Sequence, residues 1–194
     1  MRIKWITGSV MVVTLLFAAA SWSQNGKGYR KSVRHCTGDC TLTQAAAPVQ
    51  LSADEVKWLV YMREEEKLAR DVYRNLYEQW GLQIFANIAA SEQRHFDAIG
   101  VLIARYGLTD PAQGPGVFVD EKIRGLYEAL MAKGIVSSVD ALEVGVMIEE
   151  TDIDDLEDAM KSTTPRDIDK VYANLLAGSF NHLDAFNSHL QAAQ

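Results

Sequence analysis

Apolar residues recur every three or four positions through most of the sequence after residue 51, which is the spacing of one face of an α-helix. This pattern predicts four long helices. The first runs from Ser52 to Gln79 or Trp80, the second from about Ile84 to Tyr106, the third begins at Ser137 or Ser138, and the fourth follows Thr164 and runs toward Leu190. The sequence has no strand pattern, so we expect an all-α four-helix bundle.

The predicted helix ends carry residues that commonly form caps. Ser52 followed by Glu55 is a capping box, and Gly81 follows the first apolar stripe. Residues 108–137 form a long connection that holds Gly114-Pro115-Gly116 and a short helix from Asp120 to Lys133. Two short loops and one long crossover predict two antiparallel hairpins, with the second and third long helices parallel. A kink or restart at residues 151–154 remains open.

Glu92 and His95 interrupt the apolar stripe of the second helix. A Glu and a His three residues apart project from the same helix face, so both can reach one metal ion. Glu92 also lies four residues after Ile88, within the stripe, and a carboxylate that faces a core needs a partner. The alternative is a pair of solvated polar residues, or a packed core histidine.

Carboxylates interrupt the first helix as well, at Glu65 and Glu66. One of them is expected to point inward. Read as a solvated charge run, residues 64–66 would instead pair with Lys67 and Arg70, and we expect this of Glu64 and one other.

The sequence repeats itself. Residues 172–186 match residues 85–99 at an offset of 87, which pairs His95 with His182, and an offset of 84 places Glu65 and Glu66 on Glu149 and Glu150. Positions at equal distances from a hairpin turn lie level, which brings one carboxylate and one imidazole together in each hairpin. The expected interior cluster is Glu65 or Glu66, Glu92, His95, Glu149 or Glu150, and His182. Buried carboxylates are costly without cations, so a metal site is predicted.

Residues 52–190 resemble the ferritin-like, rubrerythrin-like superfamily. The runs at residues 63–73 and 88–95 resemble an uncharacterised bacterial and archaeal family of secreted ferritin-like proteins within it. The resemblance implies a dinuclear iron or manganese centre. It favours Glu66 over Glu65, because Ala69 and Tyr73 follow Glu66 at the family's spacing, and it implies that Tyr73 hydrogen-bonds a ligand.

One position departs from this pattern. The family carries Glu-x-x-His in both the second and fourth helices, but the counterpart of Glu92 in the fourth helix is Ser179. Five ligands then remain where six are expected. Two metals completed by water, one metal, and a site that has lost its metal all stay open.

The composition and net charge limit the classes of molecule that the protein is expected to bind. The chain has 194 residues, 48% of them hydrophobic, and a formal net charge of −7. An acidic body argues against nonspecific binding of nucleic acid or anionic membranes. Metal ions are the expected partners, and a homodimer is an open arrangement.

The N-terminal region reads as a targeting segment and a linker. Residues 1–23 hold Arg2, Lys4 and an apolar run, which predicts a secretory signal peptide and a periplasmic or secreted protein, with an uncleaved anchor as the alternative. Residues 24–50 read as a flexible linker before a domain at residues 51–194. Cys36 and Cys40 predict a small disulfide loop there, with a metal or redox role as the alternative.

These observations predict a ferritin-like metal-binding protein with two iron or manganese ions per chain if the site is intact. An oxidase or peroxidase acting on oxygen, peroxide or ferrous iron is the expected activity. The alternative is a metal-free or single-metal bundle that serves as a binding module.

Overall fold

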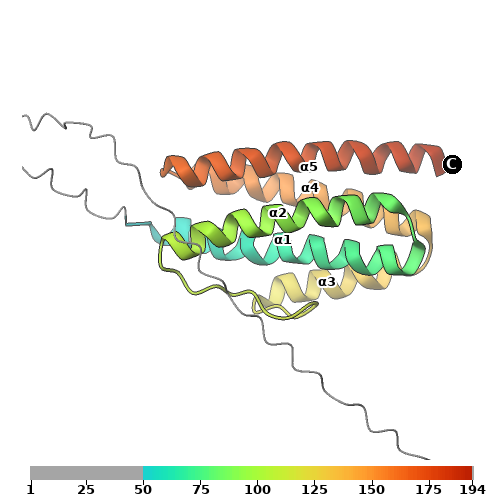
Figure 1. Cartoon of the computed structure of the whole chain (residues 1–194), viewed down its shortest axis with the longest axis horizontal. Coiled ribbons are helices and arrows are strands. Elements are labelled where there is room, and N and C mark those ends of the chain that lie inside the picture. Colours follow the sequence, from blue (N-terminus) through green and yellow to red (C-terminus); the bar gives the residue numbers. More distant parts are fainter. Residues whose placement is uncertain (1–49, 194) are drawn as a thin grey trace, which may run out of the picture. The chain divides into compact units, whose positions relative to one another are not determined.

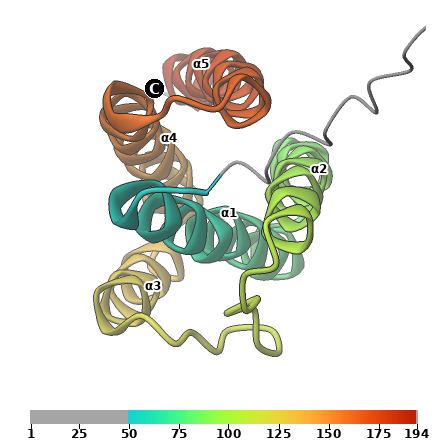
Figure 2. The same cartoon turned by 90° about the vertical axis from the view of Figure 1, so that its left-hand side faces the viewer.

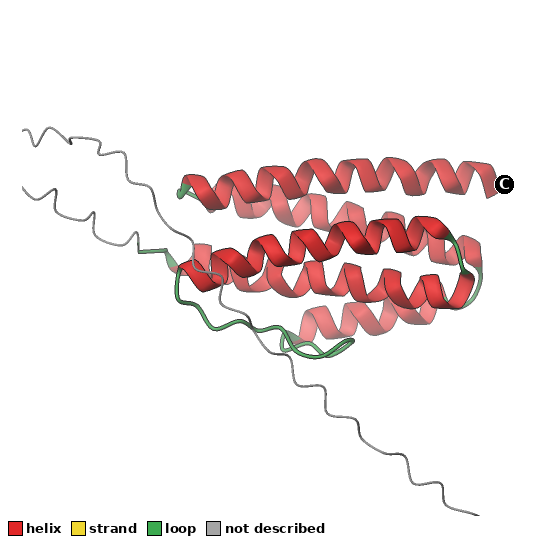
Figure 3. Cartoon of the chain, viewed as in Figure 1, coloured by secondary structure: helices red, strands yellow, loops and turns green. Residues whose placement is uncertain are grey.

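The computed structural model describes residues 50–193, and these residues form helices joined by loops, without a strand (Figure 3). The five helices are α1 (Ala53–Trp80), α2 (Gln83–Arg105), α3 (Glu121–Gly134), α4 (Ser138–Ser162) and α5 (Arg166–Ala193). The all-helical prediction is therefore confirmed. The predicted signal peptide, linker and Cys36–Cys40 loop lie outside the described residues, apart from Gln50. Among the described helices, none combines the length and the apolarity that crossing a membrane requires.

The four long helices form the bundle, and α3 lies outside it (Figures 1 and 2). α1 packs against α2, α2 against α5, α5 against α4, and α4 against α1, while α3 covers α1 and α4. Figure 1 shows that α1–α2 and α4–α5 are antiparallel hairpins and that α2 and α4 run in the same direction. The predicted hairpin order is confirmed.

Capping residues fix the helix ends close to the predicted positions. The Ser52 side chain accepts a hydrogen bond from the Glu55 backbone, and the Glu55 side chain accepts one from the Ser52 backbone. Gly81 ends α1 with a φ of 66°, in the left-handed region that glycine adopts without a steric penalty. The open alternative of a break at residues 151–154 is not observed, because α4 runs continuously through them.

Two apolar clusters fill the bundle, one toward each end. The first includes Tyr73, Phe85 and Phe186, and the second includes Leu59, Ile99 and Leu156. On each long helix a polar segment separates the two clusters. These segments hold Glu65 and Glu66 on α1, Glu92 and His95 on α2, Glu149 and Asp152 on α4, and Ser179 and His182 on α5. The bundle therefore contains a buried polar layer between two apolar ones.

The other face of α1 holds the crossover. Glu64 is only 1% exposed and accepts hydrogen bonds from the backbone nitrogens of Val119 and Asp120 at 2.6 and 2.7 Å. The prediction that Glu64 is solvated is therefore wrong. Val119 and Asp120 precede the first turn of α3, so their backbone nitrogens have no partner within that helix, and a carboxylate from α1 accepts their hydrogen bonds.

Lys67 and Asp71 extend this attachment. Lys67 is fully buried and donates to Asp71 Oδ2 at 2.8 Å and to the carbonyl of Val117 at 3.1 Å. Asp71 also accepts from the Gly116 backbone at 3.0 Å. This charged part of α1 therefore has two roles. Glu64, Lys67 and Asp71 hold the crossover, while Glu65 and Glu66 enter the polar layer.

Glu55 ties the start of α1 to the loop between α4 and α5. It accepts hydrogen bonds from the Thr164 backbone at 2.9 Å and from the Thr164 hydroxyl at 2.7 Å. Burial acts to raise the pKa of Glu55, but the hydrogen bonds from Ser52 and Thr164 outweigh it and lower the pKa from 4.5 to about 2. The carboxylate form is therefore the one that stabilises the fold.

We expect Glu55→Ala to lower the free energy of unfolding by about 1–2 kcal/mol at pH 7. Because the folded pKa is depressed, this contribution is complete above pH 4.5 and is lost as the pH falls toward about 2. Urea unfolding at pH 7 and near pH 2 measures the difference, with the exposed Asp54 of the same turn, as Asp54→Ala, for control. An equal destabilisation at both pH values would contradict this role.

Candidate metal centre

The polar layer brings together the five residues that the sequence singles out. Glu66 comes from α1, Glu92 and His95 from α2, Glu149 from α4 and His182 from α5. The three glutamates are each 1–2% exposed, and the side chains of His95 and His182 are 12% and 11% exposed. The two imidazole rings stack with their centroids 5.6 Å apart.

Glu92 lies between two triads and belongs to both. Its Oε2 is 2.8 Å from His95 Nδ1, and its Oε1 is 2.7 Å from His182 Nδ1. Glu66 completes the first triad with its Oε2 at 3.4 Å from His95 Nδ1. Glu149 completes the second with its Oε2 at 3.4 Å from His182 Nδ1. Each triad therefore offers two carboxylates and one imidazole, and one carboxylate is common to both.

The donor atoms approach each other without forming hydrogen bonds. Nδ1 of both histidines, Oε1 of Glu92 and Oε1 of Glu66 are buried and have no hydrogen-bond partner. Metal–ligand bonds of about 2.1 Å at near-right angles would place neighbouring donors about 3 Å apart. The histidine-to-carboxylate spacings of 2.7–3.4 Å fall around that value, and all donor atoms of a triad lie within 4.8 Å of one another, so the residues fit a metal ion in each triad.

Burial and the shared carboxylate set the protonation of the layer. Burial raises the pKa of Glu149 to about 8 and that of Asp152 to about 7, and it raises the pKa of Glu66 well above 4.5. Burial acts on Glu92 in the same direction, but the two imidazoles outweigh it and lower its pKa to about 2. Burial lowers the pKa of His182, yet the carboxylates of Glu149 and Glu92 raise it to about 9. Without metal, protons offset much of the charge of the layer.

A hydrogen bond and a glycine position the ligands. The Tyr73 hydroxyl donates to Glu149 Oε1 at 2.6 Å, so Tyr73 does contact a candidate ligand, which lies on the neighbouring helix α4. Gly178 lies against His95, because a Cβ at position 178 would be only 2.7 Å from Cε1 and Nε2 of that histidine. A larger residue at position 178 would displace the imidazole.

Asp152 belongs to the layer as well, although the sequence pattern does not single it out. It is 5% exposed, and its Oδ2 accepts a hydrogen bond from Ser179 Oγ at 2.5 Å, while its Oδ1 has no partner. Ser179 is therefore a partner of a buried carboxylate rather than a simple loss of a ligand. The available signal was its spacing, since Asp152 follows Glu149 by three residues, as His95 follows Glu92.

Glu65 and Glu150, the two less favoured candidates for metal ligands, differ in their burial. Glu150 is exposed and takes no part in the layer. Glu65 is 3% exposed but belongs to neither triad. Glu66 and Glu149 therefore hold equivalent places in the two triads. The repeat instead aligns Glu65 with Glu149 and Glu66 with Glu150, so the two helices differ from it by one residue.

Residues 55–193 match the family described as Uncharacterized protein domain (DUF2202). The chain belongs to the DUF2202 family. The DUF2202 domain contains nearly the whole bundle and every residue of both triads. The uncharacterised family expected from the sequence is thereby identified, and the wider ferritin-like relationship stays a prediction.

A relative and a solved structure resemble this DUF2202 chain. The Uncharacterized protein MJ0754 of Methanocaldococcus jannaschii is 51% identical over 138 residues, which are 70% of this chain and 75% of the relative. The crystal structure of hypothetical protein MJ0754 from Methanococcus jannaschii is similar with a TM-score of 0.73 at 49% identity, and the match covers 77% of this chain and 87% of that chain. The helical fold is therefore shared with this relative.

We expect the stability of the metal-free protein to fall as the pH rises from about 4.5 to 8. The folded pKa of Glu149 is raised to about 8, so its protonated form stabilises the fold below pH 4.5 and this contribution is lost as the carboxyl ionises. Glu149→Gln keeps the shape without the charge. At pH 8 this variant should exceed the metal-free wild type by about 1–3 kcal/mol in the free energy of unfolding.

Urea unfolding of chelator-treated protein at pH 5 and pH 8 measures this difference. The exposed neighbour provides a matched control, and Glu150→Gln should follow the wild type at both pH values. A Glu149→Gln variant less stable than the wild type at pH 8 would contradict the electrostatic description of the layer.

Proposed function

We propose that this DUF2202 protein is a ferritin-like metalloprotein with a dinuclear iron or manganese centre. The observation that carries the proposal is Glu92, whose two oxygens each approach a different histidine while a further carboxylate completes each triad. Glu92 would therefore contribute to holding an ion in each triad, together with Glu66 and His95 in one and Glu149 and His182 in the other. Two features support the ferritin-like relationship. The four long helices form two hairpins joined by a long crossover, and α2 contributes both a Glu and a His to the polar layer.

The donor set favours particular metals. Three carboxylates and two imidazoles suit iron and manganese, and zinc accepts the same ligand types. An iron or manganese pair would supply redox chemistry toward oxygen, peroxide or ferrous iron. We therefore propose an oxidase or peroxidase type of activity, in the periplasm or outside the cell as the N-terminal sequence suggests.

The chain's own residues prepare the site for this chemistry. The two apolar clusters exclude water from both sides of the layer, which strengthens charge interactions within it. Tyr73 holds Glu149, and Ser179 holds Asp152. Metal binding has to displace protons from His182 and Glu149, whose pKa values lie at about 9 and 8, so loading at pH 7 should release protons.

The metal content of the protein tests the proposal. The chain is depleted with a chelator, reloaded with ferrous iron or manganese without oxygen, desalted and measured by plasma mass spectrometry. We expect two metal ions per chain in the wild type and fewer in Glu149→Ala and His182→Ala. Two exposed residues on the same helices give matched controls, because Glu150→Ala and His189→Ala should keep both metals.

The opposite result favours the alternative. If the wild type holds no metal while circular dichroism shows an intact helical fold, the bundle is a metal-free binding module. One metal per chain would indicate that only one triad is occupied. Equal losses in the exposed and buried variants would show that the bound metal lies outside the layer.

A further inference from the structure

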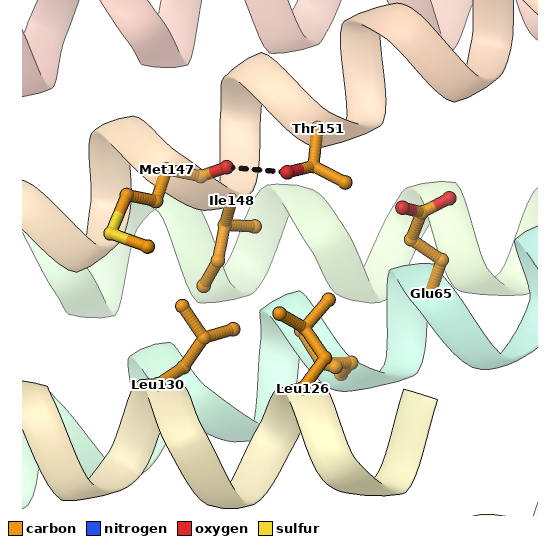
Figure 4. Close-up of a pocket in the computed structure, with 7 residues that line it drawn as sticks. Glu65, Leu126, Leu130, Met147, Ile148 and Thr151 are labelled. Carbon is orange, nitrogen blue, oxygen red and sulfur yellow. Dashed lines mark hydrogen bonds between the residues drawn. The ribbon is translucent and has the colours of Figure 1, made fainter. Parts of the chain in front are cut away.

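Glu65 is a buried carboxylate that the proposed centre does not use. It is 3% exposed, and its Oε2 has no hydrogen-bond partner. Figure 4 shows its side chain directed from α1 toward α4. Asp152 and Asp155 on α4 lie close enough to Glu65 for their negative charges to act on its carboxyl group, so acidic groups from two helices meet here. A bare carboxylate at such a position is costly unless a cation or a proton joins it.

Three acidic residues on α4 form a row. Glu149, Asp152 and Asp155 follow one another at intervals of three, which places them on one helix face. Glu149 belongs to a triad, Asp152 is 5% exposed, and Asp155 is half-buried. The row therefore leads from the buried layer toward solvent, and Glu65 faces it from α1.

Asp152, like Glu65, has one buried oxygen without a hydrogen-bond partner. Its Oδ2 is taken by Ser179, but its Oδ1 has no partner. Glu65 and Asp152 thus each hold one buried oxygen that nothing satisfies. At the outer end, Asp155 Oδ2 accepts from the Tyr61 hydroxyl at 3.0 Å, and this hydroxyl also accepts from Lys122 at 3.2 Å. The side chains grow more exposed toward this end.

The opposite side of Glu65 is apolar. A cavity of about 30 Å³ lies there between α1, α3 and α4, and Figure 4 shows the residues around it. Its lining is made mainly of Leu68, Leu126, Leu130, Met147 and Ile148. A divalent cation would lose its hydration there without gaining ligands, so the polar way past Glu65 is the one along Asp155 and Asp152.

We propose that Glu65, Asp152 and Asp155 form a transit site by which a divalent cation passes from solvent, between α1 and α4, to the metal centre. This inference rests on the proposed function. Carboxylate oxygens replace part of the hydration shell of the ion at each step. The transit site offers carboxylates without an imidazole, whereas each triad adds one, so the ion gains a nitrogen ligand by moving inward.

Cobalt(II) loading of the metal-depleted full-length chain tests the transit site. Stopped-flow absorption follows the rate at which cobalt binds, and mass spectrometry gives the final content. Glu65→Gln keeps the size and polarity of the side chain but removes its charge, and Asp155→Asn does the same nearer to solvent. We expect each to slow loading by about tenfold and to leave the final two ions per chain unchanged.

A neighbouring residue supplies the control. Asp154 is exposed beside Asp155, so Asp154→Asn changes the net charge equally and should load at the wild-type rate. Circular dichroism and urea unfolding check that each variant is folded.

Wild-type loading rates in both Glu65→Gln and Asp155→Asn would overturn the transit site, because neither carboxylate would then assist the passage of the ion. A reduced final content in Glu65→Gln would also overturn it, because Glu65 would then be a ligand of the centre itself. If the wild type takes up no cobalt, both the transit site and the proposed function fail.

Discussion

The interior of the bundle has to accommodate five carboxylates and two imidazoles in one layer, and the rest of the structure is arranged around this constraint. Such a layer is costly by itself, since removing each charge from water has a penalty that only an opposite charge, a proton or a metal ion offsets. Glu92 carries most of this constraint because it faces both histidines. The pKa values of Glu149 and His182 are raised, so protons on these two groups offset part of the negative charge when no metal is bound.

The rest of the fold places this layer. Apolar clusters lie above and below it, so the four helices are held together on both sides of the charged residues. α1 contributes in two directions, with Glu66 in the layer and Glu64 and Lys67 fixing the crossover. The crossover leads into α3, which covers α1 and α4 where Glu65 lies. One charged segment of α1 thus links the long loop, the outer helix and the candidate centre.

The sequence predicts the helices well, because their signals are local. The capping box at Ser52 and the left-handed Gly81 are read directly from residue types, and the level of each triad follows from its distance to a hairpin turn. Glu64 and Asp152 are different. Their partners are a loop 55 residues away and Ser179 on another helix, so nothing near them in the sequence indicates burial. In the sequence, Ser179 reads as a lost ligand because it stands where the repeat would place a glutamate. Only the structure shows that it donates a hydrogen bond to the buried Asp152.

The central claim is that Glu92 joins two metal positions, one beside His95 and one beside His182. Anomalous diffraction from crystals of the iron- or manganese-loaded protein, recorded at the absorption edge of the metal, tests this most directly. We predict two peaks inside the bundle, one at each triad, with the Glu92 carboxylate between them. Peaks confined to exposed acidic residues, or an interior without any peak, would contradict the claim.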